Sequence, residues 1–217
     1  MARAPMSLVR EAYDALASVV GGLADDRAWE PTGCTGWAVR DLVWHLRADA
    51  VRGLVAAHTP AGRPADCDAV TYWGAWGSDP AADERSRRMT RVEAGLHDFA
   101  SLREGYLEAA AAAVAALTAL PDGAVLATQG RAISAADLAS TLAVEATLHH
   151  ADLVAHLVAA GPTAAGLAES RRVVEGLLGR SFDGWADARV ALVGTGRAEP
   201  TAAERDDLRD ARLPVFS

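Results

Sequence analysis

The chain has 217 residues, a formal net charge of -8 and a pI near 5.2. Domains usually run to roughly 100 to 200 residues, so this length indicates one domain with an appendage and allows a sizeable core. Proteins that bind nucleic acid usually carry clustered Lys and Arg and a basic balance. The acidic charge therefore argues against a nucleic-acid partner.

Cysteine usage and hydropathy predict a cytoplasmic protein. The two cysteines, Cys34 and Cys67, lie far apart, so they indicate neither a thiolate metal cage nor a disulfide framework. The N-terminal apolar run contains Arg10, Glu11 and Asp14, unlike the uninterrupted core of a signal peptide, and predicts a first helix. Charged residues interrupt every apolar run before the roughly 18 residues that a membrane span needs. We therefore expect no membrane partner.

The apolar pattern predicts an all-α fold. Apolar residues recur at spacings of three and four through most of the first 180 residues, and alanine is abundant. Both features favour helix over strand. We expect helices at about 6–24, 38–58, 91–120, 134–160 and 164–180, of which the first four are long enough for a four-helix bundle.

Two connections separate these helices. Residues 59–83 are rich in proline and glycine and contain Tyr72, Trp73 and Trp76, which predicts a long connection. Mobile aromatic loops often cover pockets, so this loop favours a site that ligands can reach. Pro121-Asp122-Gly123 ends the third helix, and Ser134 offers a cap to the fourth.

The pattern changes beyond residue 180. Residues 188–197, ARVALVGTGR, predict a short strand and a glycine turn. Thr201 and Glu204 form a capping box for a helix that follows. We expect residues 1–160 to form the bundle and residues 161–217 to form a short C-terminal module, with a strand and helices, that packs on it.

The inward stripe of the helix at 134–160 turns from apolar to ionisable. Its members are Leu138, Leu142, Glu145, His149, Asp152 and His156. Side chains at i and i+4 stand one turn apart on one face, so Glu145 and His149 can both reach one ion. Burying such groups without partners costs several kcal/mol each, and metal coordination would satisfy both together.

The helix at 38–58 offers a third ligand. His45 lies on the edge of the apolar arc of that helix, where a neighbouring helix meets it. Two imidazoles and a carboxylate suit zinc, iron, manganese or nickel and leave positions open to water or substrate. The spacing leaves another interpretation open, in which Glu145 is a half-exposed ion-pair partner and His149 a hydrogen-bonded core histidine.

Three stretches resemble the mycothiol-dependent maleylpyruvate isomerase-like family within the DinB-like metal-binding bundles. They are WEPTGCTGWAVRDLVWHL (29–46), EATLHHAD (145–152) and VGTGRAEPTAAERDDL (193–208). The resemblance implies a DinB-like four-helix bundle with a divalent metal, held by His45, Glu145 and His149. The chain departs from the family at Ala38, where Thr or Ser commonly caps the second helix.

The resemblance also implies a function. It indicates a metal-dependent S-transferase or isomerase that uses mycothiol as thiol co-substrate and acts on a small electrophile. A metal-bound thiol loses its proton readily and becomes a nucleophile at neutral pH. Zinc is the commonest metal for such ligands with an open position. Asp152 would orient a ligating histidine, and Arg197 would bind a substrate carboxylate.

Two other functions fit the same residues. A hydrolase would use metal-bound water, with Asp152 as proton carrier. A non-catalytic bundle would bind a metal or small ligand as a sensor or stress-response accessory. Cys34 lies near a helix start that would stabilise a thiolate, although free cysteines more often serve as small buried residues.

The sequence assigns no role to two surface features. The basic residues near the aromatic loop are interpreted as a solvated helix start: Arg85, Arg87, Arg88 and Arg91. A homodimer through exposed helix faces is a further possibility that no motif supports.

Overall fold

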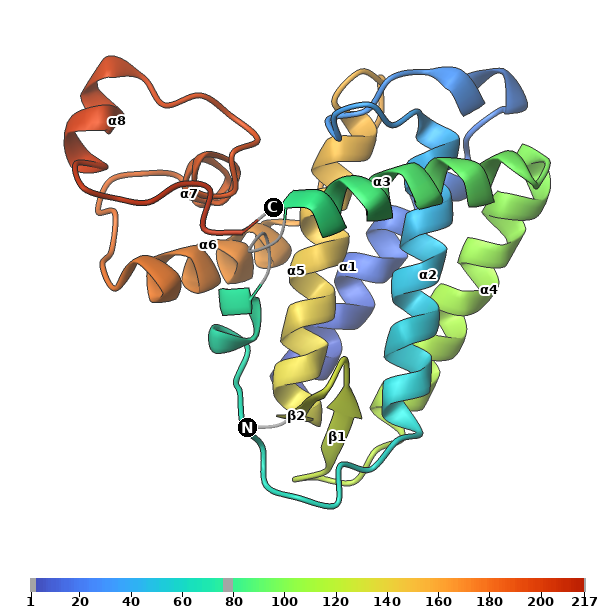
Figure 1. The fold of residues 1–217 in the computed structure, drawn as a ribbon, viewed down its shortest axis with the longest axis horizontal. Coiled ribbons are helices and arrows are strands. Elements are labelled where there is room, and N and C mark those ends of the chain that lie inside the picture. Colours follow the sequence, from blue (N-terminus) through green and yellow to red (C-terminus); the bar gives the residue numbers. More distant parts are fainter. Residues whose placement is uncertain (1–2, 76–79, 217) are drawn as a thin grey trace.

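A computed structural model describes residues 3–75 and 80–216 of the protein. Four long helices stand side by side as a bundle (Figure 1). They are α1 (Arg3–Gly21), α2 (Val39–Ala57), α4 (Phe99–Thr118) and α5 (Ala135–Val154). α1 and α2 each pack against both α4 and α5, so every helix has two neighbours in the bundle. The predicted all-α four-helix bundle is confirmed.

The bundle core follows from the three-to-four spacing of apolar residues. Each long helix contributes a leucine that is at most 1% exposed: Leu16, Leu102, Leu42 and Leu148. Burying a side chain of this size stabilises the fold by roughly 1.5 to 3 kcal/mol. The same core continues into Val173, Ala191 and Phe216, which ties the C-terminal residues to the bundle.

The remaining elements surround the bundle. They are the 3-10 helices η1 (Asp25–Trp29) and η2 (Thr71–Ala75), helix α3 (Pro80–Gly95), strands β1 (Val125–Thr128) and β2 (Arg131–Ser134), and helices α6 (Ala164–Leu178), α7 (Asp187–Gly194) and α8 (Ala202–Asp207). α3 crosses the bundle, the strands lie at one end of it, and α6 to α8 form a lobe beside α5 (Figure 1). Among the described helices, none is long and apolar enough to cross a membrane.

The helix expected at 91–120 is two helices. α3 already begins at Pro80, inside the expected loop, and ends at Gly95, and α4 starts at Phe99. The break comes at Asp98, whose carboxylate accepts a hydrogen bond from the Ser101 backbone N–H at 2.8 Å. An N-cap of this kind starts a new helix, so the chain can change direction here and lay α3 across the bundle.

A β-hairpin replaces the short connection expected before the last bundle helix. β1 and β2 pair in antiparallel register, with Val125 opposite Ser134. Gln129 and Gly130 form the turn, both with positive φ, as two-residue hairpin turns require. Ser134 then caps α5 as expected, since its hydroxyl accepts from the Asp137 backbone N–H. The hairpin turn places the Gln129 side chain beside the Tyr72 hydroxyl, 2.8 Å away.

The strand expected at residues 188–197 is wrong. Residues 187–194 form helix α7, whose buried Val190 and Val193 pack in a small cluster with Val174 and Phe182. A short valine-rich segment has no periodicity of its own, and packing against α6 decides for helix. The capping box at the next helix is confirmed, because Thr201 accepts from Glu204 N–H and Glu204 from Thr201 N–H.

Candidate metal centre

The packing of α2 against α5 brings the predicted metal ligands together. The two helices run in opposite directions, so the early turns of α2 lie beside the late turns of α5 (Figure 1). The Nε2 atoms of His45 and His149 face each other at 3.1 Å. The Oε2 atom of Glu145 lies 3.4 Å from His149 Nε2.

Asp49 joins the same group, although the sequence did not single it out. Its Oδ2 atom lies 3.1 Å from His45 Nε2. Asp49 follows His45 by four residues on α2, as His149 follows Glu145 on α5, so the signal was a second i, i+4 pair. We refer to His45, Asp49 and Glu145, which lie around His149 Nε2, as the Nε2 side of His149.

A chain of hydrogen bonds holds the other oxygen of Asp49. Arg52 Nη1 donates to Asp49 Oδ1 at 2.7 Å. A guanidinium only donates, so the amide oxygen of Gln129 faces Arg52 and accepts from its Nε at 2.8 Å, while the Gln129 amide nitrogen donates to the Tyr72 hydroxyl at 2.8 Å. The hairpin turn and η2 therefore help to position a carboxylate on α2.

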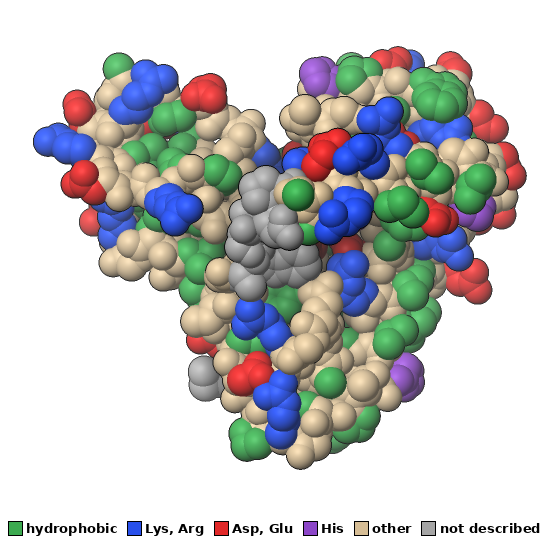
Figure 2. Space-filling model, in the orientation of Figure 1, with side chains coloured by type: hydrophobic (Ala, Val, Ile, Leu, Met, Phe, Trp, Pro, Cys, Tyr) green, Lys and Arg blue, Asp and Glu red, His purple; other side chains and the backbone are tan. Residues whose placement is uncertain are grey.

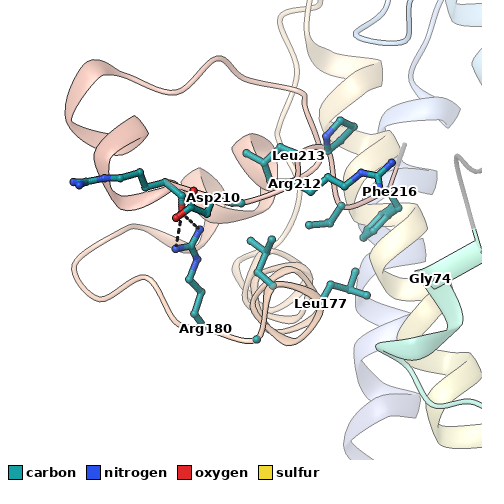
Figure 3. A pocket seen from close by; sticks show the side chains of 13 residues that line it. Gly74, Leu177, Arg180, Asp210, Arg212, Leu213 and Phe216 are labelled. Carbon is teal, nitrogen blue, oxygen red and sulfur yellow. Dashed lines mark hydrogen bonds between the residues drawn. The ribbon is translucent and has the colours of Figure 1, made fainter.

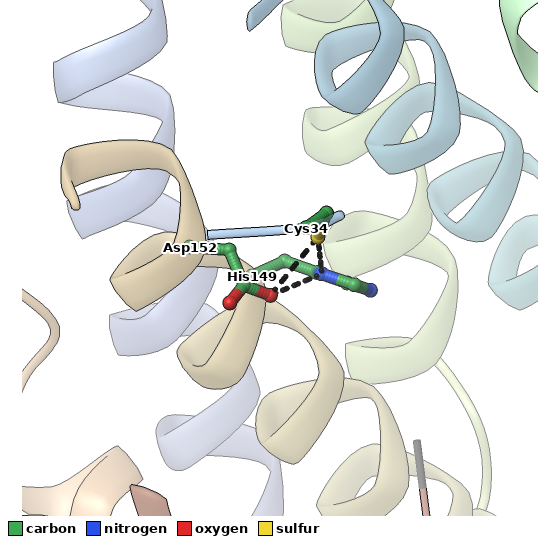
Figure 4. Close-up of side chains that lie close together, drawn as sticks. All are labelled: Cys34, His149 and Asp152. Carbon is green, nitrogen blue, oxygen red and sulfur yellow. Dashed lines mark hydrogen bonds and ion pairs between the residues drawn. The ribbon is translucent and has the colours of Figure 1, made fainter. Parts of the chain in front are cut away.

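Different groups contact the Nδ1 atom of His149. Nδ1 lies 3.0 Å from Asp152 Oδ2 and 3.8 Å from Cys34 Sγ, and the Cys34 thiol donates to Asp152 at 3.2 Å (Figure 4). Arg197 donates to the same carboxylate through Nε and Nη2, at 3.0 and 2.9 Å. We refer to Asp152, Cys34 and Arg197 as the Nδ1 side of His149.

A close approach of the backbone attaches the loop before α2 to α5. The Gly33 N–H donates to the Asp152 carbonyl at 2.8 Å. A Cβ at Gly33 would lie 2.8 Å from Asp152 Oδ1 and 3.0 Å from its Cα. Only glycine fits there, so the TGC segment of the first motif brings Cys34 to Asp152.

The helix that carries His45 begins without a side-chain cap. Ala38, where the chain departs from the family, is the N-cap residue, and its side chain has no oxygen that could cap the helix. Asp41 reaches back instead and accepts from the Ala38 backbone N–H at 2.9 Å. This single bond satisfies one of the free donors at the helix start and keeps the register that places His45.

Electrostatics differ between the two sides. Burial opposes ionisation of Asp49, but His45 and Arg52 outweigh it and hold the pKa of Asp49 at about 2. For Asp152, burial is again outweighed, here by His149 and Arg197, and the pKa lies well below its usual range. Burial opposes protonation of His149, yet hydrogen bonding to Asp152, Cys34 and Glu145 raises its pKa well above the ordinary value. Both aspartates are thus carboxylates that favour a cation beside them.

The donor set fits a metal ion. Two nitrogen lone pairs at 3.1 Å repel each other unless a proton or a metal ion lies between them. Two ligands at the usual Zn–N distance of about 2.0 to 2.1 Å in tetrahedral geometry lie roughly 3.3 Å apart, close to that spacing. Because Nδ1 of His149 can donate to Asp152, its Nε2 keeps a lone pair for the ion.

A second group of donors is less suited to a metal. Cys34, His149 and Asp152 also place ligand atoms within 4.8 Å of one another. The Asp152 carboxylate already accepts from the guanidinium of Arg197 on both oxygens. Both Asp152 oxygens are therefore occupied, whereas Oδ2 of Asp49 accepts no hydrogen bond, so we favour the Nε2 side as the metal position.

The Nε2 side is partly open. The side chains of His45 and Glu145 are 24% and 26% exposed, while those of Asp49 and His149 are 7% and 11% exposed. The Trp37 ring lies against His45 with centroids 5.0 Å apart, and its Nε1 donates to the Arg87 carbonyl on α3. A ligand that approaches the metal position from the side of His45 would therefore contact the Trp37 ring.

Among the described residues, a small cavity lies at the centre and a larger one lies away from it. One of about 10 Å³, room for about one water molecule, touches Asp49, Arg52, Tyr72 and Glu145. The larger one, about 880 Å³, lies between α6 and the C-terminal tail and is lined by residues such as Arg180 and Phe216 (Figure 3). Its described lining includes none of the predicted metal ligands, so size does not mark the candidate centre in this molecule.

Other residues from the sequence analysis lie as follows. Tyr72 and Trp73 of the aromatic loop are buried at 6% and 2% exposure, so these two form part of the core rather than a mobile cover. Trp76 lies outside the described residues. The basic residues near the aromatic loop are exposed on α3: Arg85, Arg87, Arg88 and Arg91. Figure 2 shows Arg and acidic side chains interspersed on the face of the molecule that α3 crosses. Arg87 and Arg88 each pair with Glu84 at 3.5 Å.

Comparison with known proteins places the chain in a family. Residues 9–154 match the family described as mycothiol maleylpyruvate isomerase N-terminal domain. Two solved structures, the mycothiol-dependent maleylpyruvate isomerase and a mutant of it, are similar in fold at 16% and 14% identity. Each comparison covers 80% of this chain and 69% of the other, with a TM-score of 0.58. No curated protein matches the chain. Because the family match spans most of the chain and includes the Nε2 side, this protein belongs to the mycothiol maleylpyruvate isomerase N-terminal domain family.

Proposed function

We propose that the protein is a metal-dependent S-transferase or isomerase that uses mycothiol and acts on a small electrophile. The observation that carries this proposal is the facing pair of Nε2 atoms, 3.1 Å apart, with a carboxylate beside each imidazole. Membership of the family supports a thiol of the mycothiol type as co-substrate.

The metal ligands in this proposal are His45, Glu145 and His149. A divalent cation held there, most simply zinc, would lower the pKa of a thiol bound to it and supply a nucleophile at neutral pH. Glu145 and His45 are the more exposed ligands, so the thiol would enter from their side. Trp37 would exclude water from one flank of His45.

Asp152 holds the geometry of the centre through His149. It accepts from Nδ1 and thereby directs the Nε2 lone pair toward the metal position. Arg197 fixes Asp152 with two hydrogen bonds, which leaves little of its guanidinium for a substrate. Binding of a substrate carboxylate by Arg197 stays a prediction. The hydrogen bonds to Asp152 support an additional role, in which Arg197 positions that carboxylate.

The thiol sulfur adds to an electrophilic carbon of the substrate. In an isomerase, the new C–S bond forms while a C=C bond becomes a single bond and an enolate holds the electron pair. Rotation about that single bond follows, and the C=C bond re-forms as the C–S bond breaks. In a transferase, the enolate takes a proton and the adduct is the product.

The decisive experiment incubates the zinc-loaded protein with mycothiol and a panel of small electrophiles, including cis-alkene acids. Mass spectrometry detects adducts, and chromatography separates isomers. We expect an adduct or an isomerised product that depends on both metal and thiol, and neither product with His149→Ala.

Two outcomes would overturn the proposal. Turnover of the panel with metal but without thiol would indicate a hydrolase that activates water. Stoichiometric metal binding with no product from any electrophile would indicate a non-catalytic metal-binding bundle.

A further inference from the structure

We propose that Asp49 is a fourth protein ligand of the metal, beside the two histidines and Glu145. The inference rests on the proposed metal site and extends it. It makes the centre one of two imidazoles and two carboxylates, with one carboxylate and one imidazole from each of α2 and α5.

The two aspartates of the site differ in which imidazole nitrogen they contact. Asp152 lies at 3.0 Å from Nδ1 of His149, the nitrogen that points away from the metal position. A carboxylate in that place orients the ring. Asp49 instead lies at 3.1 Å from Nε2 of His45, the nitrogen that faces His149. A carboxylate oxygen on the metal side of a ligating histidine is placed as a ligand.

Burial supports the same assignment. Asp49 is 5% exposed, and its Oδ2 atom is buried without any hydrogen bond of acceptable geometry. His45 Nε2, at 3.1 Å, lies within ion-pair distance but makes no hydrogen bond to this oxygen, so the hydrogen-bonding capacity of Oδ2 is unused. An unsatisfied buried carboxylate oxygen costs free energy, and a cation between it and the imidazole removes that cost.

Hydrogen bonds to the other oxygen, Oδ1, fix the orientation of the Asp49 carboxylate. Oδ1 accepts from Arg52, and Gln129 and Tyr72 fix the guanidinium from the far side. The carboxylate therefore cannot turn away from the metal position without breaking the bond to Arg52. Metal ligands are commonly oriented by such outer hydrogen bonds, and here they come from the hairpin turn and η2.

The assignment has a chemical consequence. Two carboxylates neutralise a divalent cation, and two oxygens with two nitrogens suit zinc as well as manganese or iron. Four protein ligands complete a tetrahedral zinc shell. An incoming thiol must then raise the coordination number to five or displace one ligand.

The first test measures metal affinity by competition with a chromophoric chelator, for Zn²⁺ and Mn²⁺. Loss of an outer hydrogen-bonding partner typically weakens binding about 10- to 100-fold. We expect Asp49→Asn to weaken it by more than roughly 100-fold, as loss of a ligand should. Asp49→Glu retains a carboxylate and should recover most of the affinity. Asp206→Asn, an exposed aspartate on α8, is the matched control and should bind as the wild type.

Wild-type affinity in a folded Asp49→Asn variant would overturn the inference while leaving the proposed function intact. Absence of metal from the wild-type protein would instead overturn the proposed function. A crystal structure of the zinc-loaded wild type needs no variant to fold. We expect Asp49 Oδ2 at about 2.0 to 2.2 Å from zinc, and a separation above roughly 3 Å would also overturn the inference.

Discussion

The two sides of the His149 ring are built in different ways. The Nε2 side comes from one antiparallel helix pair, α2 and α5, and its residues are spaced by four along each helix. The Nδ1 side brings together a loop residue, Cys34, and a C-terminal residue, Arg197, around Asp152. The first side depends on helical periodicity and one packing contact, whereas the second depends on the whole fold. Substitutions should therefore separate metal binding from its support.

Removal of His149 should have the largest effect, because this ring belongs to both sides. We expect His149→Ala to lose bound metal entirely, and His45→Ala to do the same from the Nε2 side alone. Elemental analysis of the purified proteins measures the stoichiometry, with circular dichroism to confirm the helical fold. Full stoichiometry in either folded variant would remove this site from consideration.

Substitutions on the Nδ1 side should weaken metal binding without abolishing it. We expect Asp152→Asn and Arg197→Ala each to lower metal affinity about 10- to 100-fold, since they disturb only the orientation of His149. The double variant should be scarcely weaker than the stronger single one, because Arg197 acts through Asp152. Chelator competition measures all three.

Arg197→Ala can also reveal whether the Nδ1 side contacts the substrate. If Arg197→Ala binds metal as the wild type and yet loses turnover through a higher KM, its guanidinium contacts the substrate as the sequence first suggested. The Nδ1 side would then be part of the substrate site rather than a support for the metal.

A side chain added at Gly33, where the loop before α2 meets α5, should displace the backbone that carries Cys34 and Asp152. Gly33→Ala places a Cβ within 3.0 Å of Asp152 atoms that include its Cα, so the backbone must shift. Overpacking of this kind costs roughly 1 to 3 kcal/mol of unfolding free energy. Urea unfolding measures it, and Gly22→Ala, whose Cβ would meet atoms no closer than 3.5 Å, is the control. Equal stability of the two variants would contradict the close approach.

The smallest effect is expected far from either side, on α8. Hydrogen bonds from Arg189 lower the pKa of Glu204 from 4.5 to about 2. A carboxyl with a lowered pKa stabilises the fold above its unfolded pKa, and this contribution disappears as pH falls through the folded value. The wild type should therefore exceed Glu204→Gln in unfolding temperature near neutral pH, and the difference should vanish as pH falls from about 4.5 to 2. A difference in unfolding temperature that grew on acidification would contradict this assignment. Glu204→Gln should bind metal at neutral pH as the wild type does.

Much of the fold followed from local patterns. The long helices of the bundle, the Ser134 cap and the Thr201–Glu204 capping box depend on residue spacing within a few turns. The break at Asp98 and the turn at Gln129-Gly130 also have local signals. The continuous apolar pattern around Asp98 predicted one uninterrupted helix. The hairpin turn was missed because the pattern on either side of it is helical. The valine-rich stretch of α7 predicted a strand locally, and contact with α6 decided for helix.

The sequence predicts the bundle and the pairing of Glu145 with His149, because helical periodicity converts spacing into a shared face. With the resemblance, it also selected His45. Three further contacts come from tertiary packing. Asp49, beside His45 Nε2, lies close to His149, Gln129 and Tyr72 hold Arg52 behind Asp49, and Arg197 reaches Asp152. Those contacts join segments far apart in the chain, and their meeting depends on helix packing and loop paths that no local pattern encodes.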